Sequence, residues 1–181
     1  MVEITTERLS IRRMQDDDLL DFIEYESHPE HCRYLSRGPY TVEAAREFIA
    51  IARDLPLGAE GQYLHLAIES QATMKMIGTV CVKVVSQVHR QGDVGWFLHR
   101  DYQRQGLASE ASRAMLEFAF TTLDLHRVTA HCDADNTRSR GMMERLGMRQ
   151  EGFYRGIAYF DEVWHDQYLY AMLAAEWMSA A

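Results

Sequence analysis

The sequence predicts a fold of the α+β class, in which a mixed but mostly antiparallel sheet of six to seven strands is flanked by about four helices. Three observations predict it. Two helical segments precede the main run of strands, three strand-like stretches then follow one another across short turns, and a long amphipathic helix begins directly after the third. The 181 residues contain no repeat and no Pro/Ser-rich linker, so we expect a single domain over residues 1–181.

The first part of the chain indicates a strand followed by two helices. Residues 8–13 alternate between apolar and polar side chains, which is typical of a strand. The carboxylates of residues 16–18 then stand where the first turn of a helix would favour negative charge. Thr41 is suited to cap a second helix, whose apolar residues recur at helical spacing until Pro56 ends it.

The second part supplies most of the sheet. Strand-like stretches at 63–69, 76–85 and 93–99 predict an antiparallel meander. Residues 105–123 carry Ala, Leu, Met and Phe along one stripe, which predicts an amphipathic helix. The remaining elements are a strand at 127–133, a helix at 136–146 closed by Gly147, and strands at 148–154 and 163–173.

Charge and cysteine usage narrow the class of protein. The formal net charge of -8, from 27 acidic and 19 basic residues, repels phosphate polyanions and disfavours a nucleic-acid partner. Cys32, Cys81 and Cys132 show no C-x-x-C spacing, so we expect neither a disulfide framework nor a metal site. No apolar run is long enough to span a bilayer, and the first residues lack an apolar leader. These features predict a cytoplasmic protein without a membrane partner.

The most informative motif is a small-residue turn, Gln103-Arg104-Gln105-Gly106-Leu107-Ala108, between a predicted strand and the long helix. The first N–H groups of a helix have no partner within it, and the helix dipole adds positive charge there, so such a turn stabilises an anion. Gly106 and Ala108 would let a diphosphate approach the backbone closely, and Arg104 can add charge. Plain strand-to-helix turns carry the same string.

This turn resembles motif A of the GNAT superfamily of N-acetyltransferases, in which Q/R-x-x-G-x-G/A wraps the pyrophosphate of coenzyme A. Asp93-Val94-Gly95-Trp96-Phe97-Leu98 is similar to the strand before that motif, and Ser109-Glu110-Ala111 to the start of its helix. Asn136-Thr137-Arg138-Ser139 with Leu146-Gly147-Met148 is similar to a later N-x-x-S helix.

The two ends of the chain resemble one branch of that superfamily. Thr6-Glu7-Arg8-Leu9 with Arg12, and Trp164-His165-Asp166 with Tyr170 and Glu176-Trp177, are similar to the RimJ/RimL-type ribosomal-protein acetyltransferases. The resemblance therefore covers nearly the whole chain. It implies an acetyl-coenzyme A-dependent N-acetyltransferase of the acyltransferase class, with a sheet splayed between its fourth and fifth strands to admit the pantetheine arm.

The resemblance also implies a set of site residues. The residues expected to bind the coenzyme are Phe97, Leu98, His99, Gln103, Arg104, Gln105, Gly106, Leu107, Ala108, Ser109, Asn136 and Ser139. A backbone N–H of residues 97–99 would polarise the thioester oxygen. The basic run of Arg127, Arg138, Arg140 and Arg145 either meets the 3′-phosphate of coenzyme A or decorates a helix face.

Ser139 and Asp93 are the expected catalytic residues. Ser139 would lie near the thioester sulfur and donate to, or protonate, the departing thiolate, although a solvent-facing helix serine fits the same pattern. Asp93 is the first candidate for the general base, acting through water, although acidic residues at strand edges are commonly just solvated. Asn136 is suited to the pantetheine arm and is also a favoured N-cap. No cysteine has a base in a recognisable nucleophile setting, so the amine is expected to attack directly in a ternary complex.

The acceptor amine is left open. A protein N-terminus, including that of a ribosomal protein, is one class, and a polyamine, amino acid or antibiotic is another. A noncatalytic acyl-coenzyme A sensor is a third reading. We expect the acceptor to be shaped by the two early helices, by a loop at residues 28–32 and by a loop at residues 156–162. Acidic residues in these segments suit a cationic acceptor, and the resemblance also allows a homodimer.

Overall fold

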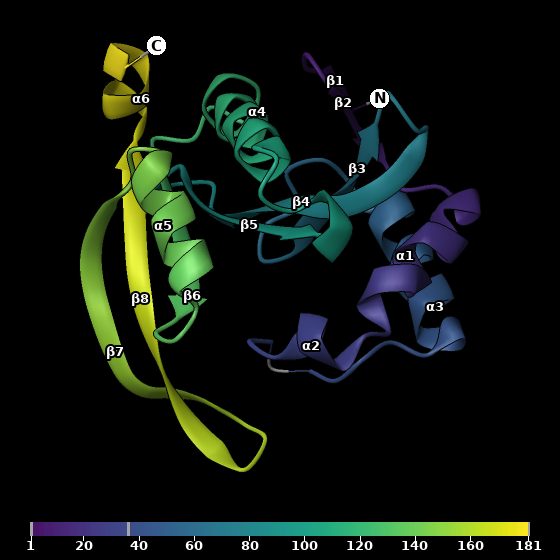
Figure 1. The fold of residues 1–181 in the computed structure, drawn as a ribbon. Helices are drawn as coiled ribbons and strands as arrows, with labels where there is room; N and C mark the ends of the chain where they lie inside the picture. Colours follow the sequence, from purple (N-terminus) through teal and green to yellow (C-terminus); the bar gives the residue numbers. More distant parts are fainter. Residues whose placement is uncertain (1, 36, 181) are drawn as a thin grey trace.

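The computed structural model describes residues 2–35 and 37–180, and its eight strands form one sheet in the order β1-β2-β3-β4-β5-β6-β8-β7 (Figure 1). Only β5 and β6 run parallel; the other neighbours are antiparallel. The strands are β1 (Glu3–Thr5), β2 (Leu9–Arg13), β3 (Tyr63–Ser70), β4 (Lys75–Ser86), β5 (Gln91–Leu98), β6 (Arg127–Asp133), β7 (Arg149–Phe160) and β8 (Val163–Leu173). The predicted mixed, mostly antiparallel sheet is confirmed.

The helices lie on both faces of this sheet. In Figure 1, α4 lies on one side of β4 and β5, while α1 and α3 lie on the other. The helices are α1 (Leu19–Glu26), α2 (Pro29–Cys32), α3 (Val42–Asp54), α4 (Leu107–Thr121), α5 (Thr137–Arg145) and α6 (Ala174–Ala180), with short 3-10 turns η1 (Asp16–Asp18) and η2 (Arg100–Tyr102). Within residues 2–35 and 37–180, no helix is long and apolar enough to cross a membrane.

Three short elements escaped the sequence prediction. β1 has only three residues, too few for an alternation pattern to emerge. The segment expected to be a loop at residues 28–32 contains α2, because Pro29 occupies the first helical turn, where proline is favoured. The chain also adds α6 after β8.

The loop expected at residues 156–162 is also wrong, because β7 continues to Phe160. Gly156, at a φ of 56°, lies at an irregularity in the β7–β8 ladder rather than in a connecting loop. Asp161 and Glu162 alone make the turn, both with positive φ, as a tight two-residue hairpin requires. The hairpin therefore reaches far beyond the body of the sheet (Figure 1).

The predicted helix boundaries at two caps are confirmed. The Thr41 hydroxyl accepts a hydrogen bond from the N–H of Ala44 at 3.2 Å, and the Asn136 side chain accepts one from Ser139 at 3.0 Å. Gly147 follows α5 with a φ of 84°, a conformation that glycine adopts without strain. Local sequence chemistry thus determines where α3 and α5 begin and where α5 ends.

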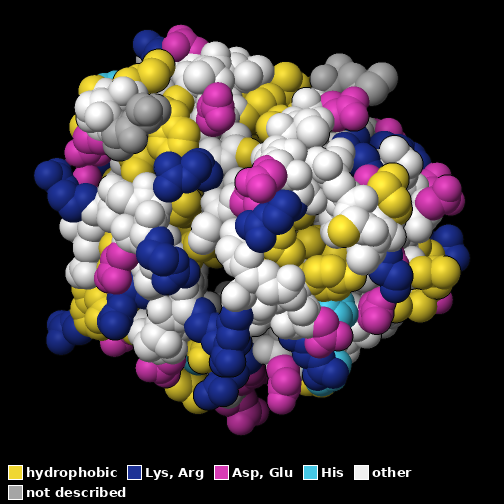
Figure 2. Space-filling model, turned by 45° about the horizontal axis from the view of Figure 1, so that its top comes forward, with side chains coloured by type: hydrophobic (Ala, Val, Ile, Leu, Met, Phe, Trp, Pro, Cys, Tyr) yellow, Lys and Arg dark blue, Asp and Glu magenta, His cyan; other side chains and the backbone are white. Residues whose placement is uncertain are grey.

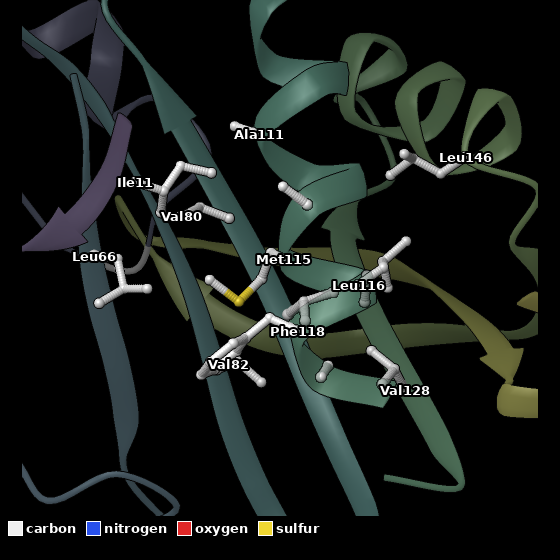
Figure 3. Packing of buried hydrophobic residues seen from close by; sticks show 14 of the residues in the cluster. Ile11, Leu66, Val80, Val82, Ala111, Met115, Leu116, Phe118, Val128 and Leu146 are labelled. Carbon is white, nitrogen blue, oxygen red and sulfur yellow. The ribbon is translucent and has the colours of Figure 1, made fainter. Parts of the chain in front are cut away.

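The main core lies between the sheet and helices α4 and α5. Even-numbered apolar residues of β3 to β6 point to this side and pack with Met115, Leu116 and Phe118 of α4 and Leu146 after α5 (Figure 3). A second cluster, including Phe22 and Ile49, packs α1 and α3 on the opposite face. Because side chains alternate along each strand, one face of the sheet packs against α4 and α5 and the other against α1 and α3.

An ion-pair network joins β2, β3 and the start of α1. The Arg12 guanidinium donates to both carboxylate oxygens of Asp18, at 2.8 and 2.9 Å, and to Glu69 at 2.6 Å. Hydrogen bonding to Asp18 and Glu69 raises the pKa of Arg12 further above its ordinary value. The predicted acidic turn at 16–18 therefore does more than begin a helix, since Asp18 is buried against Arg12.

We expect Arg12→Ala to lower the free energy of unfolding by about 3 kcal/mol, because it leaves two largely buried carboxylates without their cation. Urea unfolding measures this change. Arg53→Ala is the matched control: its pairs with Asp16 and Asp54 are exposed to solvent, so its loss of stability should be much smaller. Equal losses of stability in the two variants would contradict the view that the buried Arg12 network stabilises the fold more than an exposed ion pair does.

Candidate active site

The sheet divides between β5 and β6. These parallel strands pair only at Gln91–Arg127, Gly92–Val128 and Asp93–Thr129, although β5 continues to Leu98 and β6 to Asp133. A V-shaped slot therefore opens beyond Asp93. It lies between the strands where the splay was expected, counted as the fifth and sixth here because β1 was not predicted.

Alternation along β5 decides which backbone groups face the slot. The His99 N–H donates to the carbonyl of Ile77 in β4, at 2.8 Å. In an antiparallel ladder alternate residues point their backbone groups to the same neighbour, so the groups of Phe97 also face β4. The backbone groups of Trp96 and Leu98 face the slot instead, and the Leu98 carbonyl accepts from Gln103 at 3.0 Å. The expectation that residues 97–99 all offer free backbone groups is thus corrected to Leu98, with Trp96 added.

The turn at residues 103–109 has the geometry of an anion cradle. Arg104 and Gly106 have φ values of 63° and 80°, with Gln105 between them outside the positive region. Such alternation turns successive N–H groups toward a common side. Among the residues the structure describes, the N–H groups of 104–109 have no hydrogen-bond acceptor, and the first helix bond comes from Glu110 to Gly106 at 3.0 Å. The turn therefore leaves a row of donors at the head of α4.

The N-terminal segment fixes this turn in place. The Glu110 carboxylate accepts from the Thr6 hydroxyl at 2.5 Å and from the N–H and side chain of Arg8 at 2.9 and 2.7 Å. Arg8 also donates to the Gln105 carbonyl at 2.9 Å. Although burial opposes it, hydrogen bonding to Thr6 and Arg8 lowers the pKa of Glu110 below its ordinary value. Two motifs about a hundred residues apart in the sequence thus form one clamp.

Asp93 lies at the closed end of the slot and is buried. Its carboxylate accepts hydrogen bonds from Tyr63 at 2.6 Å and Thr129 at 2.7 Å, and lies 3.1 Å from Nε2 of His131. Burial and the Asp93 charge raise the pKa of Tyr63, so its hydroxyl stays a donor. Sequence reasoning missed these three partners, because they come from β3 and β6.

Asn136 and Ser139 stand at the start of α5, beside the end of β6. The Asn136 side chain is an N-cap, as one of the two readings held. Ser139 is half-buried, and within the described part of the chain its hydroxyl makes no hydrogen bond. Its neighbour Arg138 reaches across from α5 to Gln103 at 3.2 Å, which links the two sides of the slot.

A cavity of about 210 Å³ opens beside the end of β5. It is bounded by α1, α2, the segment from His99 to Gln103, and Arg138. Glu24 and Glu30 place carboxylates on its wall, and His28 and His31 add imidazoles. The segment at residues 28–32 therefore lines this cavity, and it forms a helix rather than the expected loop.

Comparison with known proteins agrees with this geometry. A family model described as an acetyltransferase (GNAT) domain matches residues 8–149. The chain belongs to the GNAT acetyltransferase family. It is 32% identical over 176 residues to YnaD of Bacillus subtilis strain 168, an uncharacterized N-acetyltransferase, covering 97% of this chain and 99% of YnaD.

Two further comparisons cover the whole GNAT fold. The crystal structure of a GNAT-family acetyltransferase from Bacillus anthracis is similar with a TM-score of 0.86 and 30% identity, covering 97% of this chain and all of that one. The ribosomal protein uS5-alanine N-acetyltransferase of Escherichia coli K12 is 25% identical over 190 residues, covering 97% and 93% of the two chains. The resemblance to ribosomal-protein acetyltransferases is confirmed.

The family establishes the general class of chemistry. The protein is an N-acetyltransferase of the acyltransferase class, and GNAT acetyltransferases use acetyl-coenzyme A. Across residues 2–35 and 37–180, no group of three or more His, Cys, Asp or Glu side chains is arranged to hold a metal ion. The roles of individual residues are taken up below.

We expect Glu110→Gln to destabilise the protein at neutral pH, because it removes the charge that Thr6 and Arg8 stabilise. The pKa of Glu110 is lowered in the folded state, so its contribution is present above the unfolded value and lost as the pH falls through the folded one. Urea unfolding at about pH 6 and about pH 3 should show a difference from wild type that disappears in acid. Glu117→Gln, on the exposed side of the same helix, should show no such pH dependence.

Proposed function

We propose that the protein transfers the acetyl group of acetyl-coenzyme A to a primary amine by direct attack within a ternary complex, and that residues 1–181 act as one domain. The observation that carries this proposal is the slot beyond Asp93, which ends beside a row of unpaired N–H groups at residues 104–109. A sheet opening next to an anion cradle suits a long thioester that ends in a diphosphate.

The residues at the head of α4 fit a pyrophosphate. The N–H groups of residues 104–109 would donate to it, with the Arg104 side chain adding charge and Gln103 and Ser109 flanking the turn. Acidic and basic side chains are interspersed over the surface in Figure 2, so the net charge of -8 does not exclude an anion locally. Arg138 stands at the same mouth, whereas Arg127 is engaged by Glu151 at 2.5 and 3.0 Å.

The slot itself fits the pantetheine arm. The backbone groups of Trp96 and the N–H of Leu98 would pair with its amides, in the way an added strand pairs with a sheet edge, while the Leu98 carbonyl already accepts from Gln103. The N–H of Leu98 is the best-placed donor for the thioester oxygen. The Asn136 side chain, already used as an N-cap, has further donor capacity for the arm.

The same geometry supports a donor for the departing thiolate and direct transfer of the acetyl group to the amine. Ser139, with its free hydroxyl at the first turn of α5, would donate to the thiolate. Asp93 accepts hydrogen bonds from Tyr63 and Thr129 and lies beside His131, so it suits holding β3, β5 and β6 together better than accepting a proton through water. Burial raises the pKa of Cys81 to about 12 and of Cys132 to about 11, which keeps both thiols protonated and favours direct attack over an acyl-enzyme.

For the acceptor we propose the N-terminal amine of a protein. A full-length relative is named for acetylating the alanine of ribosomal protein uS5, and the carboxylates of Glu24 and Glu30 on the cavity wall suit an ammonium group. The same carboxylates suit a polyamine, amino acid or aminoglycoside, which is the alternative acceptor class. A noncatalytic sensor would keep the slot without turnover.

Thiol release from acetyl-coenzyme A tests the function. We expect release to depend on an added amine and to be fastest with peptides that present a free N-terminus, compared with polyamines, amino acids and aminoglycosides. N-terminally blocked copies of the same peptides are the control and should be inert. Tight coenzyme binding without release on any amine would overturn the proposed transferase in favour of a sensor.

The cradle is tested by Gly106→Ala. A side chain at a φ of 80° costs roughly 1 kcal/mol or more and would crowd Arg8, so the turn must change shape. We expect the affinity for coenzyme A, measured by calorimetry, to fall about tenfold. Gly58→Ala is the matched control, with a φ of 73° in open space far along the sequence, and should bind as wild type does. Equal affinities of wild type and both variants for coenzyme A would contradict the proposal that this turn binds the pyrophosphate.

A further inference from the structure

Two Asp–His pairs lie on the face of the sheet turned away from α4 and α5. In β6 the even-numbered residues pack against those helices, so His131 and Asp133 point to the opposite side. His131 pairs with Asp93 of β5, and Asp133 pairs with His165 of β8. α1 and α2 lie on this same side, and the tip of the β7–β8 hairpin extends past them in Figure 1.

The second pair is closely held. Nδ1 of His165 lies 2.8 Å from Oδ2 of Asp133, whose side chain is only 3% exposed. The other Asp133 oxygen accepts from the N–H of Asp135 at 2.9 Å, and the Phe160 ring stacks on the imidazole at 3.7 Å between centroids. A carboxylate on Nδ1 favours the tautomer with hydrogen there, which leaves the lone pair on Nε2.

That second nitrogen has no partner. Nε2 of His165 is buried, and within residues 2–35 and 37–180 no group forms a hydrogen bond with it. A buried nitrogen without a partner costs free energy, and natural proteins keep few such atoms. The position opposite His165 on β7 is Ala158, whose methyl side chain offers no partner either. The lone pair on Nε2 is therefore unused, and an N–H donor of a bound molecule would satisfy it.

The pair also stands at the right level of the slot. Counted along the parallel strands from the Asp93–Thr129 pair, Asp133 is level with Phe97 and therefore next to Leu98, whose N–H faces the slot. His131 is level with Gly95, nearer the closed end. Gln167 is the partner of Asp133 on β8, so His165, two residues away, is level with His99 and stands closer than His131 to the height at which the thioester oxygen would be bound.

We propose that His165, positioned by Asp133, is the general base that takes the proton from the acceptor amine. This inference rests on the proposed transferase activity. As the nitrogen–carbon bond forms, Nε2 accepts one N–H proton of the amine. The carbon–sulfur bond then breaks with its electron pair on sulfur, the thiolate gains a proton from solvent through the Ser139 hydroxyl, and Nε2 of His165 releases its proton to solvent. Asp133 is a positioning residue, since it acts only through His165.

Other titratable groups surround this imidazole. Asp166, its neighbour on β8, is occupied by the N–H of Gly156 at 2.7 Å, and His131 and Asp93 lie on the two strands beyond Asp133. His131 is therefore the rival base on the same face, with a side chain 41% exposed against 22% for His165. The variants must separate the two.

Kinetics with the best amine of the panel provide the first test. We expect His165→Gln to lower kcat about 100-fold, to leave KM for acetyl-coenzyme A unchanged and to abolish the rising limb of the rate against pH. Asp133→Asn should reduce kcat in the same direction, and imidazole should restore part of the rate to His165→Ala. His89→Gln, in the exposed turn between β4 and β5, is the control and should match wild type. Loss of the limb in His131→Gln but not in His165→Gln would overturn the proposal.

Nitrogen-15 NMR of the histidines provides a second test that needs no turnover. We expect the His165 signals to show hydrogen on Nδ1 and a free Nε2 in wild type, and to lose this tautomer preference in Asp133→Asn. Coenzyme A without an acetyl group forms a complex with the amine that cannot react. We expect the nitrogen-15 shift of Nε2 to move in this complex, because the amine N–H would then donate to Nε2. Hydrogen on Nε2, or a shift unmoved in a complex that calorimetry shows has formed, would overturn the role of His165. Absence of turnover in wild type with this tautomer present would instead count against the proposed transferase.

Discussion

The rest of the site depends on how soon β5 and β6 part. Parallel pairing stops after three residue pairs, and at the last of them Asp93 accepts hydrogen bonds from Tyr63 of β3 and Thr129 of β6. This buried carboxylate links β3, β5 and β6 at the point where the pairing of β5 with β6 ends. Beyond it, the backbone groups of Trp96 and Leu98 lack strand partners. Unpaired backbone groups inside a sheet cost free energy unless a ligand satisfies them. The end of strand pairing at Asp93 therefore leaves backbone groups that a ligand in the open part of the slot would bind.

Strand alternation places core packing on one face of the sheet and the polar groups beside the slot on the other. Most even-numbered residues of β3 to β6 are apolar and form the core with α4 and α5, which holds the turn at residues 103–109 in place. Odd-numbered residues of the same strands include Tyr63, Asp93 and His131, and they face the side of α1 and α2. The elements that we propose to hold the coenzyme are thus packed into the core, while polar groups gather on the opposite face, from which we propose that the acceptor approaches.

The sequence allowed the order of the elements, the glycine turn before α4 and the cap of α5 to be predicted, because each depends on residues close together in the chain. Gly106 and Asn136 carry their own local signals. The partners of Asp93 could not be predicted, since Tyr63 and Thr129 reach it only through the strand order. The Thr6–Arg8–Glu110 clamp was missed for the same reason, although both of its motifs had been noticed. Which of residues 96 to 98 faces the slot follows from the register of β4 against β5, which alternation within one strand cannot supply.

The acceptor face is assembled from the least regular parts of the chain. α2 is a single turn started by a proline, and β7 bends at Gly156 before its two-residue turn at Asp161 and Glu162. A bulge re-aims the side chains that follow it, so its position decides what stands opposite β8 near His165. If these segments bind the acceptor as we propose, changes in them would alter the acceptor without disturbing α4 or the slot, because the residues proposed to hold the coenzyme belong to other elements. Shared use of one slot by enzymes with different acceptors is the expected consequence of such a division.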